Sequence, residues 1–306
     1  MPLLDREEYQ NLSRQLERYE DIEKVARETS LDPELLMVIH TQRVTRDATK
    51  RFYVVQGHAP RLLKQWRSGQ SYLDLAREWR FPPVLMAQMI EREKQTPRRA
   101  FWDGFRHPEA IPDARIRREV EEVLAHDWIY SPRGGELQRE RGVKGEARLA
   151  RWLEQFHLGY RTEKDLRGKF AKTPDALLDQ PVVIDGQSVH WIESKANFGD
   201  DVELRRNLRK QLEPYVRMFG EGIVVYWYGH IREAASIPGV RVVDGETLER
   251  LVPLPVGEAA APMVPTPPRE RPAPRTPATP RPSAPPPAHP PAKRPVRRPA
   301  DRSAYF

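Results

Sequence analysis

The 306-residue sequence contains no cysteine. This absence excludes disulfide bonds, cysteine-based zinc sites, thiolate catalysis and haem or iron–sulfur clusters held by cysteine. The eight histidines show no paired spacing typical of metal ligands. A glycine-rich phosphate loop and a nucleophile elbow are also missing, so the sequence has neither the motif of a P-loop nucleotidase nor that of a serine hydrolase.

Long apolar runs are missing as well. The longest run, Ile223 to Tyr228, is far below the roughly 20 residues that a membrane-spanning helix needs. The N-terminal sequence MPLLDREEYQ is charged from Asp5 onward and has no apolar stretch of the length found in secretion signals. These features predict an intracellular protein without membrane association, cytoplasmic or, in a eukaryote, nuclear.

Positive charge and proline are concentrated at the C-terminal end. The chain has 51 Lys+Arg and 44 Asp+Glu, a net charge of +7, and residues 256–306 contribute +6 of it. The same residues hold 16 of the 31 prolines and almost no large apolar side chain. Because such a segment cannot bury enough surface to offset its ordering entropy, we expect a disordered Pro/Arg-rich tail over 256–306. Its role is open between nonspecific attraction to nucleic acid, a polyproline II ligand and a spacer.

The first hundred residues have the pattern of helices joined by short turns. Apolar residues recur every three or four positions from Leu12 to Ala26, and Asp32-Pro33 then supplies an N-cap and a first helical residue. The outline returns further on, where Ser71 can cap one helix and Pro82-Pro83 can open the next. We interpret residues 1–100 as a tandem helix-turn-helix-like region, an outline that ordinary helical bundles share.

A basic cluster ends the second of these units. Its members are Arg92, Lys94, Arg98 and Arg99. A helix ending in such side chains can lie in a major groove with its basic groups on phosphates, so we predict that the four residues bind nucleic acid. The alternative is a solvated, charged helix end.

Residues 101–139 are interpreted as a helical connector that ends near Gly134-Gly135. From 140 to 255 the pattern is helix, three strands, helix and strand, beginning with a helix from Val143 to Phe156 and a strand near Tyr160. A helix over 200–219, kinked at Pro214, is expected to precede the buried strand at 222–229. This order predicts an α/β core domain over 140–255.

Two β-rich runs joined by Asp185-Gly186 predict a hairpin. Residues two apart in a strand face the same way, so Glu193 and Lys195 project together. A three-residue loop pairing Ile184 with Ser188, with a bulge or edge at Pro181, brings Asp175 close to both.

Two converging carboxylates with an open coordination sphere suit a hard cation such as Mg²⁺ or Mn²⁺. Asp175 and Glu193 are therefore predicted metal ligands. Lys195 is expected to orient a water molecule or to stabilise charge in the transition state. Each motif alone is common in proteins without such a site. The combination of Pro-Asp and Glu-x-Lys within this order of elements is much more specific for a catalytic metal site.

The arrangement Pro174-Asp175 followed by Glu193-Ser194-Lys195 resembles the PD-(D/E)xK nuclease superfamily. More narrowly, the strings KTPDALL, PVVIDGQSVHWIESKANFGDD and GIVVYWYG resemble the TPD-motif family of PD-(D/E)xK nuclease-like proteins, which has archaeal members and includes the eukaryotic codanin-interacting nuclease. The resemblance covers about residues 140–235 and does not extend to the Pro/Arg-rich tail.

This resemblance implies a restriction-endonuclease-like αβββαβ core with a catalytic site at Asp175, Glu193 and Lys195. Many superfamily members carry a further glutamate on the first core helix, and Glu146 is in the corresponding place, where stabilisation of the helix dipole is the alternative role. In this superfamily a polar residue on the helix after the third strand often assists the catalytic site, and Gln211 fits that position.

The sequence thus predicts a Mg²⁺-dependent phosphodiesterase that hydrolyses DNA, including branched or structured DNA, with DNA favoured over RNA. The helical region would grip the substrate. The alternative is a non-catalytic DNA-binding regulator or adaptor that uses an inert nuclease fold. A homodimer is a further expectation if both strands of a junction are cut, and no protein partner is predicted.

Overall fold

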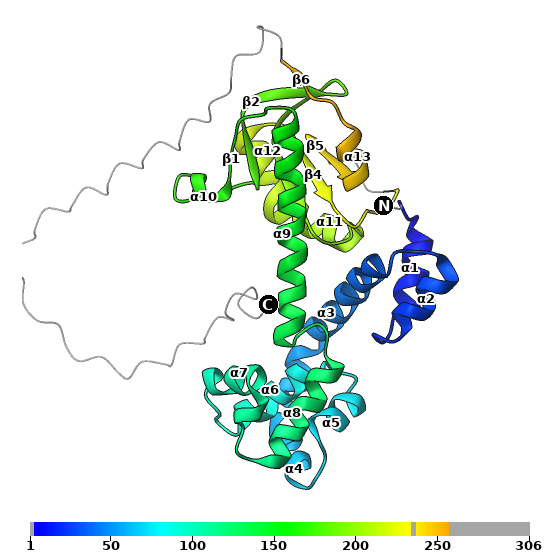
Figure 1. The fold of residues 1–306 in the computed structure, drawn as a ribbon, viewed down its shortest axis with the longest axis vertical. Coiled ribbons are helices and arrows are strands. Elements are labelled where there is room, and N and C mark those ends of the chain that lie inside the picture. The colour runs from blue at the N-terminus through cyan, green and yellow to red at the C-terminus, as the bar shows by residue number, and fades with distance from the viewer. Residues whose placement is uncertain (1–2, 234–236, 257–306) are drawn as a thin grey trace, which may run out of the picture. The chain divides into compact units, whose positions relative to one another are not determined.

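Side-chain caps set the starts of the N-terminal helices. The computed structural model describes residues 3–233 and 237–256, so the predicted tail lies outside the described residues from 257 onward. Asp5 accepts a hydrogen bond from the Glu8 N–H at the start of α1, and Asp32 accepts one from the Glu34 N–H before α3. The helices of this part are α1 (Arg6–Gln15), α2 (Asp21–Thr29), α3 (Pro33–Gly57), α4 (Ala59–Arg67), α5 (Tyr72–Glu78), α6 (Pro83–Glu93), α7 (Arg98–Arg106), the 3-10 turn η1 (Pro108–Ala110) and α8 (Ala114–His126) (Figure 1).

The predicted helix starts in the second helical unit are confirmed. Ser71 caps α5 in a capping box with Asp74, because each residue bonds the backbone N–H of the other. Pro83 is the first residue of α6. Proline suits this position because its missing N–H would have no partner within the helix.

The helix α9 (Pro132–Gln155) runs without a break through Gly134-Gly135. The expected boundary at this pair is wrong, and the helix begins well before Val143. Ser131 caps α9, with its Oγ accepting a hydrogen bond from the Gly134 N–H at 3.1 Å. A Cβ at Gly134 would lie 2.6 Å from the Trp128 carbonyl oxygen, so the glycine permits the close approach of the preceding turn rather than ending a helix.

A mixed sheet follows α9, in the order β1-β2-β3-β4-β5, with β6 pairing β2. The hairpin strands β2 and β3 are antiparallel, whereas β3, β4 and β5 are parallel. The strands are β1 (Tyr160–Arg161), β2 (Ala176–Ile184), β3 (Gln187–Lys195), β4 (Gly222–Tyr226), β5 (Val240–Asp244) and β6 (Leu254–Pro255), and the short helix α10 (Glu163–Leu166) lies between β1 and β2. The predicted α/β core is confirmed at this level.

The β2–β3 hairpin has a tighter loop than expected. Ile184 pairs with Gln187, so the loop is Asp185-Gly186 alone and the expected three-residue loop is wrong. Both loop residues have positive φ, 48° and 81°, which two-residue hairpin turns of type I′ require. The register shifts between Leu177 and Val182, where a bulge was predicted.

The chain between β3 and β4 is helical but irregular. It consists of α11 (Asp201–Asn207), the π-helical turn η2 (Leu208–Leu212) and α12 (Glu213–Phe219). The predicted interruption is confirmed and lies just before Pro214, which has no N–H to bond to the Lys210 carbonyl four residues earlier. That carbonyl instead accepts a hydrogen bond from Lys172 Nζ.

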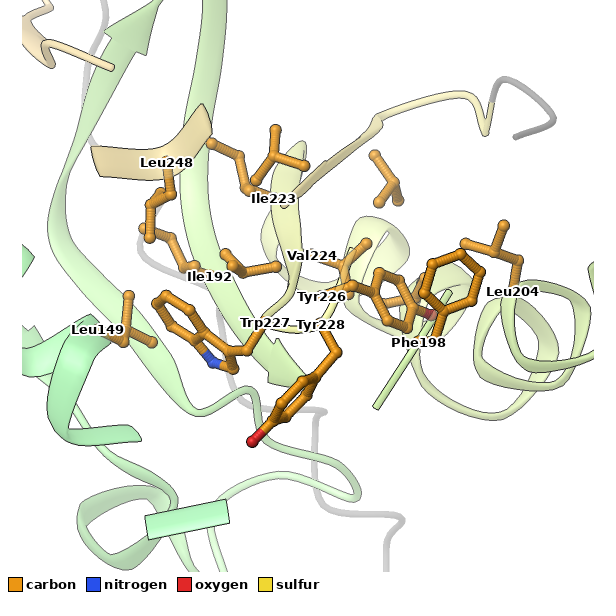
Figure 2. Packing of buried hydrophobic residues seen from close by; sticks show 14 of the residues in the cluster. Leu149, Ile192, Phe198, Leu204, Ile223, Val224, Tyr226, Trp227, Tyr228 and Leu248 are labelled. Atoms are coloured by element: carbon orange, nitrogen blue, oxygen red, sulfur yellow. The ribbon is translucent and has the colours of Figure 1, made fainter. Parts of the chain in front are cut away.

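Buried side chains form two clusters. One joins the sheet to α9, α11, α12 and α13 (Gly245–Arg250), and it also includes residues from α1, α2 and the first half of α3. Figure 2 shows part of this cluster, in which the β4 side chains lie between Leu149 of α9 and Leu204 of α11. The other cluster extends from Ala48 in α3 to Val123 in α8. Within the described ranges, no helix is both long and apolar enough to cross a bilayer.

Candidate active site

The predicted aspartate and glutamate meet where β2 begins and β3 ends. Ala176 pairs with Ile192, which places Asp175 beside Glu193. The Asp175 N–H donates to Glu193 Oε2 at 3.2 Å, and the Ser194 N–H donates to Asp175 Oδ2 at 2.8 Å. These bonds fix the two carboxylates relative to each other through the backbone of both strands.

Lys195 completes the group. Its Nζ lies 2.5 Å from Glu193 Oε1, and its side chain is 18% exposed, against 3% for the glutamate. The structure therefore brings together Asp175, Glu193 and Lys195, with the ammonium at the solvent-facing side of a buried carboxylate.

Burial dominates the electrostatics of both carboxylates. It raises the pKa of Glu193 to about 7, even though Lys195 acts in the opposite direction. Burial also raises the pKa of Asp175 above its ordinary value, against the hydrogen bond from Ser194 and the charge of Lys195. Two carboxylates with one ammonium leave a buried excess of negative charge, which a bound cation would compensate.

Tyr215 on α12 is a member of the site that sequence reasoning missed. Its hydroxyl donates to the Thr173 carbonyl at 2.7 Å and so holds the loop that carries Asp175. The tyrosine is 2% exposed and contacts Trp191 edge-on, with ring centroids 5.2 Å apart. Burial, followed by the charges of Glu193 and Asp175, raises the pKa of its hydroxyl. In the sequence Tyr215 is one apolar-face position of a helix, with no local signal of this role.

Ser194 anchors the site strand from its other face. Its Oγ accepts a hydrogen bond from Trp227 Nε1 at 2.7 Å. The indole in turn lies under the Arg148 guanidinium at 4.6 Å and against Gly145 of α9, where a Cβ would lie 2.5 Å from Trp227 Cδ1. The glycine thus lets α9 approach the indole that braces β3.

Glu146 and Gln211 lie near this group in different ways. Glu146 is on α9, and its pKa is raised first by burial and then by the negative charge of Asp175. Gln211 is in η2, next to Lys210. The Lys210 carbonyl accepts a hydrogen bond from Lys172, which lies in the loop that carries Asp175. The structure brings Glu146 within electrostatic range of Asp175 and leaves Gln211 without a hydrogen bond to the three central residues.

The donor set suits a hard cation that keeps most of its own ligands. Within residues 3–233 and 237–256, Asp175 Oδ1 accepts no hydrogen bond. Over the same ranges, no group of three or more histidine or acidic side chains could hold a metal ion. Two protein carboxylates plus water and phosphate oxygens are a common arrangement for Mg²⁺.

A buried ionic network joins α3 to the chain just after the site. Arg46 Nη1 lies 2.5 Å from Asp200 Oδ2, and its Nη2 lies 3.2 Å from Glu203 Oε1. Tyr9 of α1 also bonds Asp200, and Gln42 bonds both backbone groups of Phe198. Asp200 caps α11, and the network fixes this cap to the N-terminal helices.

The predicted basic cluster lies at the end of α6 and the start of α7. Arg92, Arg98 and Arg99 are exposed. Lys94 is held within the fold, since its Nζ lies 2.6 Å from Glu91 Oε1 and 4.4 Å from the Trp66 ring centre.

Comparison with known proteins identifies the family of this chain. Human CDAN1-interacting nuclease 1 is 34% identical over 209 residues, which cover 63% of this chain and 71% of the human protein. This chain belongs to the TPD-motif family. The family model, described as "Protein of unknown function TPD sequence-motif", matches residues 112–245. The predicted membership is confirmed.

Other relatives match shorter parts of the chain. The zebrafish (Danio rerio) CDAN1-interacting nuclease 1 is 36% identical over 169 residues, or 53% of this chain and 56% of the relative. An uncharacterized protein, L539, of Acanthamoeba polyphaga mimivirus is 32% identical over 115 residues, or 35% of this chain and 42% of the relative. No solved structure matches the chain.

Proposed function

We propose that this protein is a metal-dependent nuclease that hydrolyses phosphodiester bonds of DNA, with a core of the restriction-endonuclease type. The proposal depends on one observation, which is the convergence of Asp175, Glu193 and Lys195 at adjacent strand ends. The name nuclease borne by the vertebrate relatives supports it.

Asp175 and Glu193 are the residues that would hold Mg²⁺ or Mn²⁺. A divalent cation at such a site lowers the pKa of bound water and neutralises charge on a scissile phosphate. The raised pKa values of both carboxylates support this assignment, because buried negative charge is stabilised by a cation. Glu146 would add to the acidic side of the site through its proximity to Asp175.

Lys195 would supply the hydrogen bonds to the reacting groups. Its ammonium has three N–H donors, and Glu193 Oε1 accepts from it at 2.5 Å. The remaining donors can bond an attacking water or a phosphate oxygen. Tyr215 would keep the loop in place by holding the Thr173 carbonyl, and Gln211 would assist from η2.

The helical region would position the DNA. Arg92, Arg98 and Arg99 are exposed on α6 and α7 and offer phosphate contacts. Such contacts fix orientation without reading sequence. The helical region would therefore place a strand for cleavage by the α/β core.

The experiment is cleavage of end-labelled single-stranded, duplex, flap and four-way-junction DNA, with matching RNA, in Mg²⁺, Mn²⁺ or EDTA. Lys195→Ala is compared with wild type and with Lys24→Ala, which changes an exposed lysine of α2. We expect metal-dependent products that fall by about 100-fold or more in Lys195→Ala and persist in Lys24→Ala. Absence of products on every substrate, with tight DNA binding in EDTA, would overturn the nuclease proposal in favour of a binding protein.

A further inference from the structure

Helix α7 carries a basic stripe with an aromatic ring in its centre. Arg98, Trp102 and Arg106 are four residues apart, a spacing that places them on one helix face. Together with Arg99 they line a surface hollow. None of these residues belongs to the site at Asp175, and two of them, Trp102 and Arg106, were not singled out by the sequence.

Trp102 is fixed on its inner side and accessible on its outer side. Its ring meets Phe101 edge-on at 5.0 Å and Phe105 at 6.2 Å between centroids. Both phenylalanines are buried in the helical cluster, whereas Trp102 is partly exposed. The indole is therefore held in a defined orientation and still presents surface to the hollow.

The charge around Trp102 is positive. Arg99 and Arg106 share one carboxylate, Asp103, at 3.6 Å and 2.9 Å. Arg98 has no ion pair among the residues that the structure describes. The arginines thus exceed the acidic groups, and the Arg99 side chain is 95% exposed. A ligand suited to this surface is anionic and carries a flat ring.

A nucleotide has both properties. Guanidinium groups bind phosphate through paired hydrogen bonds, and an accessible indole stacks on a base of any identity. In a duplex the base faces are covered by their neighbours, so only an unpaired base can reach the ring.

We propose that this face of α7 binds an unpaired nucleotide of single-stranded or branched DNA, with its phosphates on Arg98, Arg99 and Arg106 and its base on Trp102. The inference rests on the proposed function for the choice of DNA. It goes further by naming the substrate class, which is DNA with unpaired bases, and a second site for holding it.

The test measures DNA affinity by fluorescence anisotropy of labelled DNA, in EDTA, using the full chain with Lys195→Ala so that cleavage plays no part. The ligands are a flapped duplex, the same flap with abasic sites in place of its bases, and a blunt duplex. The variants are Trp102→Ala, Trp102→Phe and the control Tyr53→Ala, which removes an aromatic side chain that is 55% exposed on α3. Thermal melting confirms that each variant is folded.

We expect Trp102→Ala to weaken binding of the flap by about 5- to 150-fold, the effect of one stacked base. Binding of the abasic flap and the blunt duplex should hardly change, Trp102→Phe should keep most of the affinity, and Tyr53→Ala should bind like the parent. Arg98→Glu should weaken the binding of all three ligands and lower the salt dependence of their affinities, because it removes a phosphate contact.

Equal losses of affinity for flap and blunt duplex in Trp102→Ala, an abasic flap that the parent chain binds as tightly as the natural one, or no DNA binding by the parent chain would each overturn the inference. These outcomes are independent of catalysis. A flap preference that depends on Trp102, found together with no cleavage by wild type in metal, would support the inference while overturning the nuclease proposal.

Discussion

Glu193 links the protonation of the site to the stability of the fold. Burial raises its pKa from an ordinary 4.5 to about 7. Between these two pH values the folded protein holds a proton at Glu193 that the unfolded chain has lost, so the contribution of Glu193 to stability is fully present below about pH 4.5 and is lost as the pH rises through about 7. At about 1.4 kcal/mol per pH unit, the loss amounts to roughly 3 kcal/mol.

Glu193→Gln removes this titration with little change of shape. In EDTA, we expect the free energy of unfolding of the wild type to fall by roughly 3 kcal/mol more than that of Glu193→Gln between pH 5 and pH 8. In thermal scans this is a relative shift of about 6–12 °C. Groups distant from Glu193 that titrate in this range act equally on both proteins. Glu154→Gln, at an exposed position of α9, is the matched control and should follow the wild type.

Added Mg²⁺ gives the second half of the test. A cation that binds the folded state stabilises it by mass action, so at pH 8 Mg²⁺ should raise the melting temperature of the wild type more than that of Glu193→Gln. Parallel pH curves for the two proteins would refute the reasoning, because they would show that Glu193 does not titrate in this window. Equal responses to Mg²⁺ would refute its assignment as a metal ligand.

Three further substitutions test the supports of the site. Gly145→Ala should lower the free energy of unfolding by about 1–3 kcal/mol and slow cleavage, because its methyl group overlaps the Trp227 indole that braces β3. Gly142→Ala on the same helix is the control, because its methyl group contacts no other atom. In urea titrations this control should be neutral or stabilising by up to about 1 kcal/mol. Arg46→Ala should destabilise by about 3–5 kcal/mol, because it leaves the buried Asp200 carboxylate without its ion pair and removes one of the two ion pairs of Glu203. Lys50→Ala, at an exposed position of the same helix, should not destabilise the protein. Equal midpoints for the two variants would contradict the structural role of the network. Tyr215→Phe should cost about 1 kcal/mol and lower the single-turnover cleavage rate several-fold, since it removes the hydrogen bond to the Thr173 carbonyl in the loop that carries Asp175. An unchanged rate would show that this loop needs no such support.

Local signals were strong enough to predict most elements. Asp32-Pro33, Ser71 and Pro83 mark helix starts because caps and fixed φ angles act within a few residues. Asp185-Gly186 marks the hairpin for the same local reason, although the length of its loop depended on the register of the strands. The predicted boundary at Gly134-Gly135 is wrong, because a helix whose start is capped tolerates glycines where another part of the backbone passes close by.

The candidate site also combines features that the local sequence predicts with features that depend on tertiary packing. The alternation of a strand places Glu193 and Lys195 on one face, and the spacing to Asp175 can be read from the chain. The burial that shifts their pKa values, the brace from Trp227 through Ser194 and the contact of Tyr215 with the loop all come from elements distant in sequence. The sequence by itself determined which elements form and which residue types carry the chemistry, because caps, turns and strand alternation are short-range. Only the tertiary structure decided how deeply the carboxylates are buried and what holds them, because both depend on packing between elements far apart along the chain.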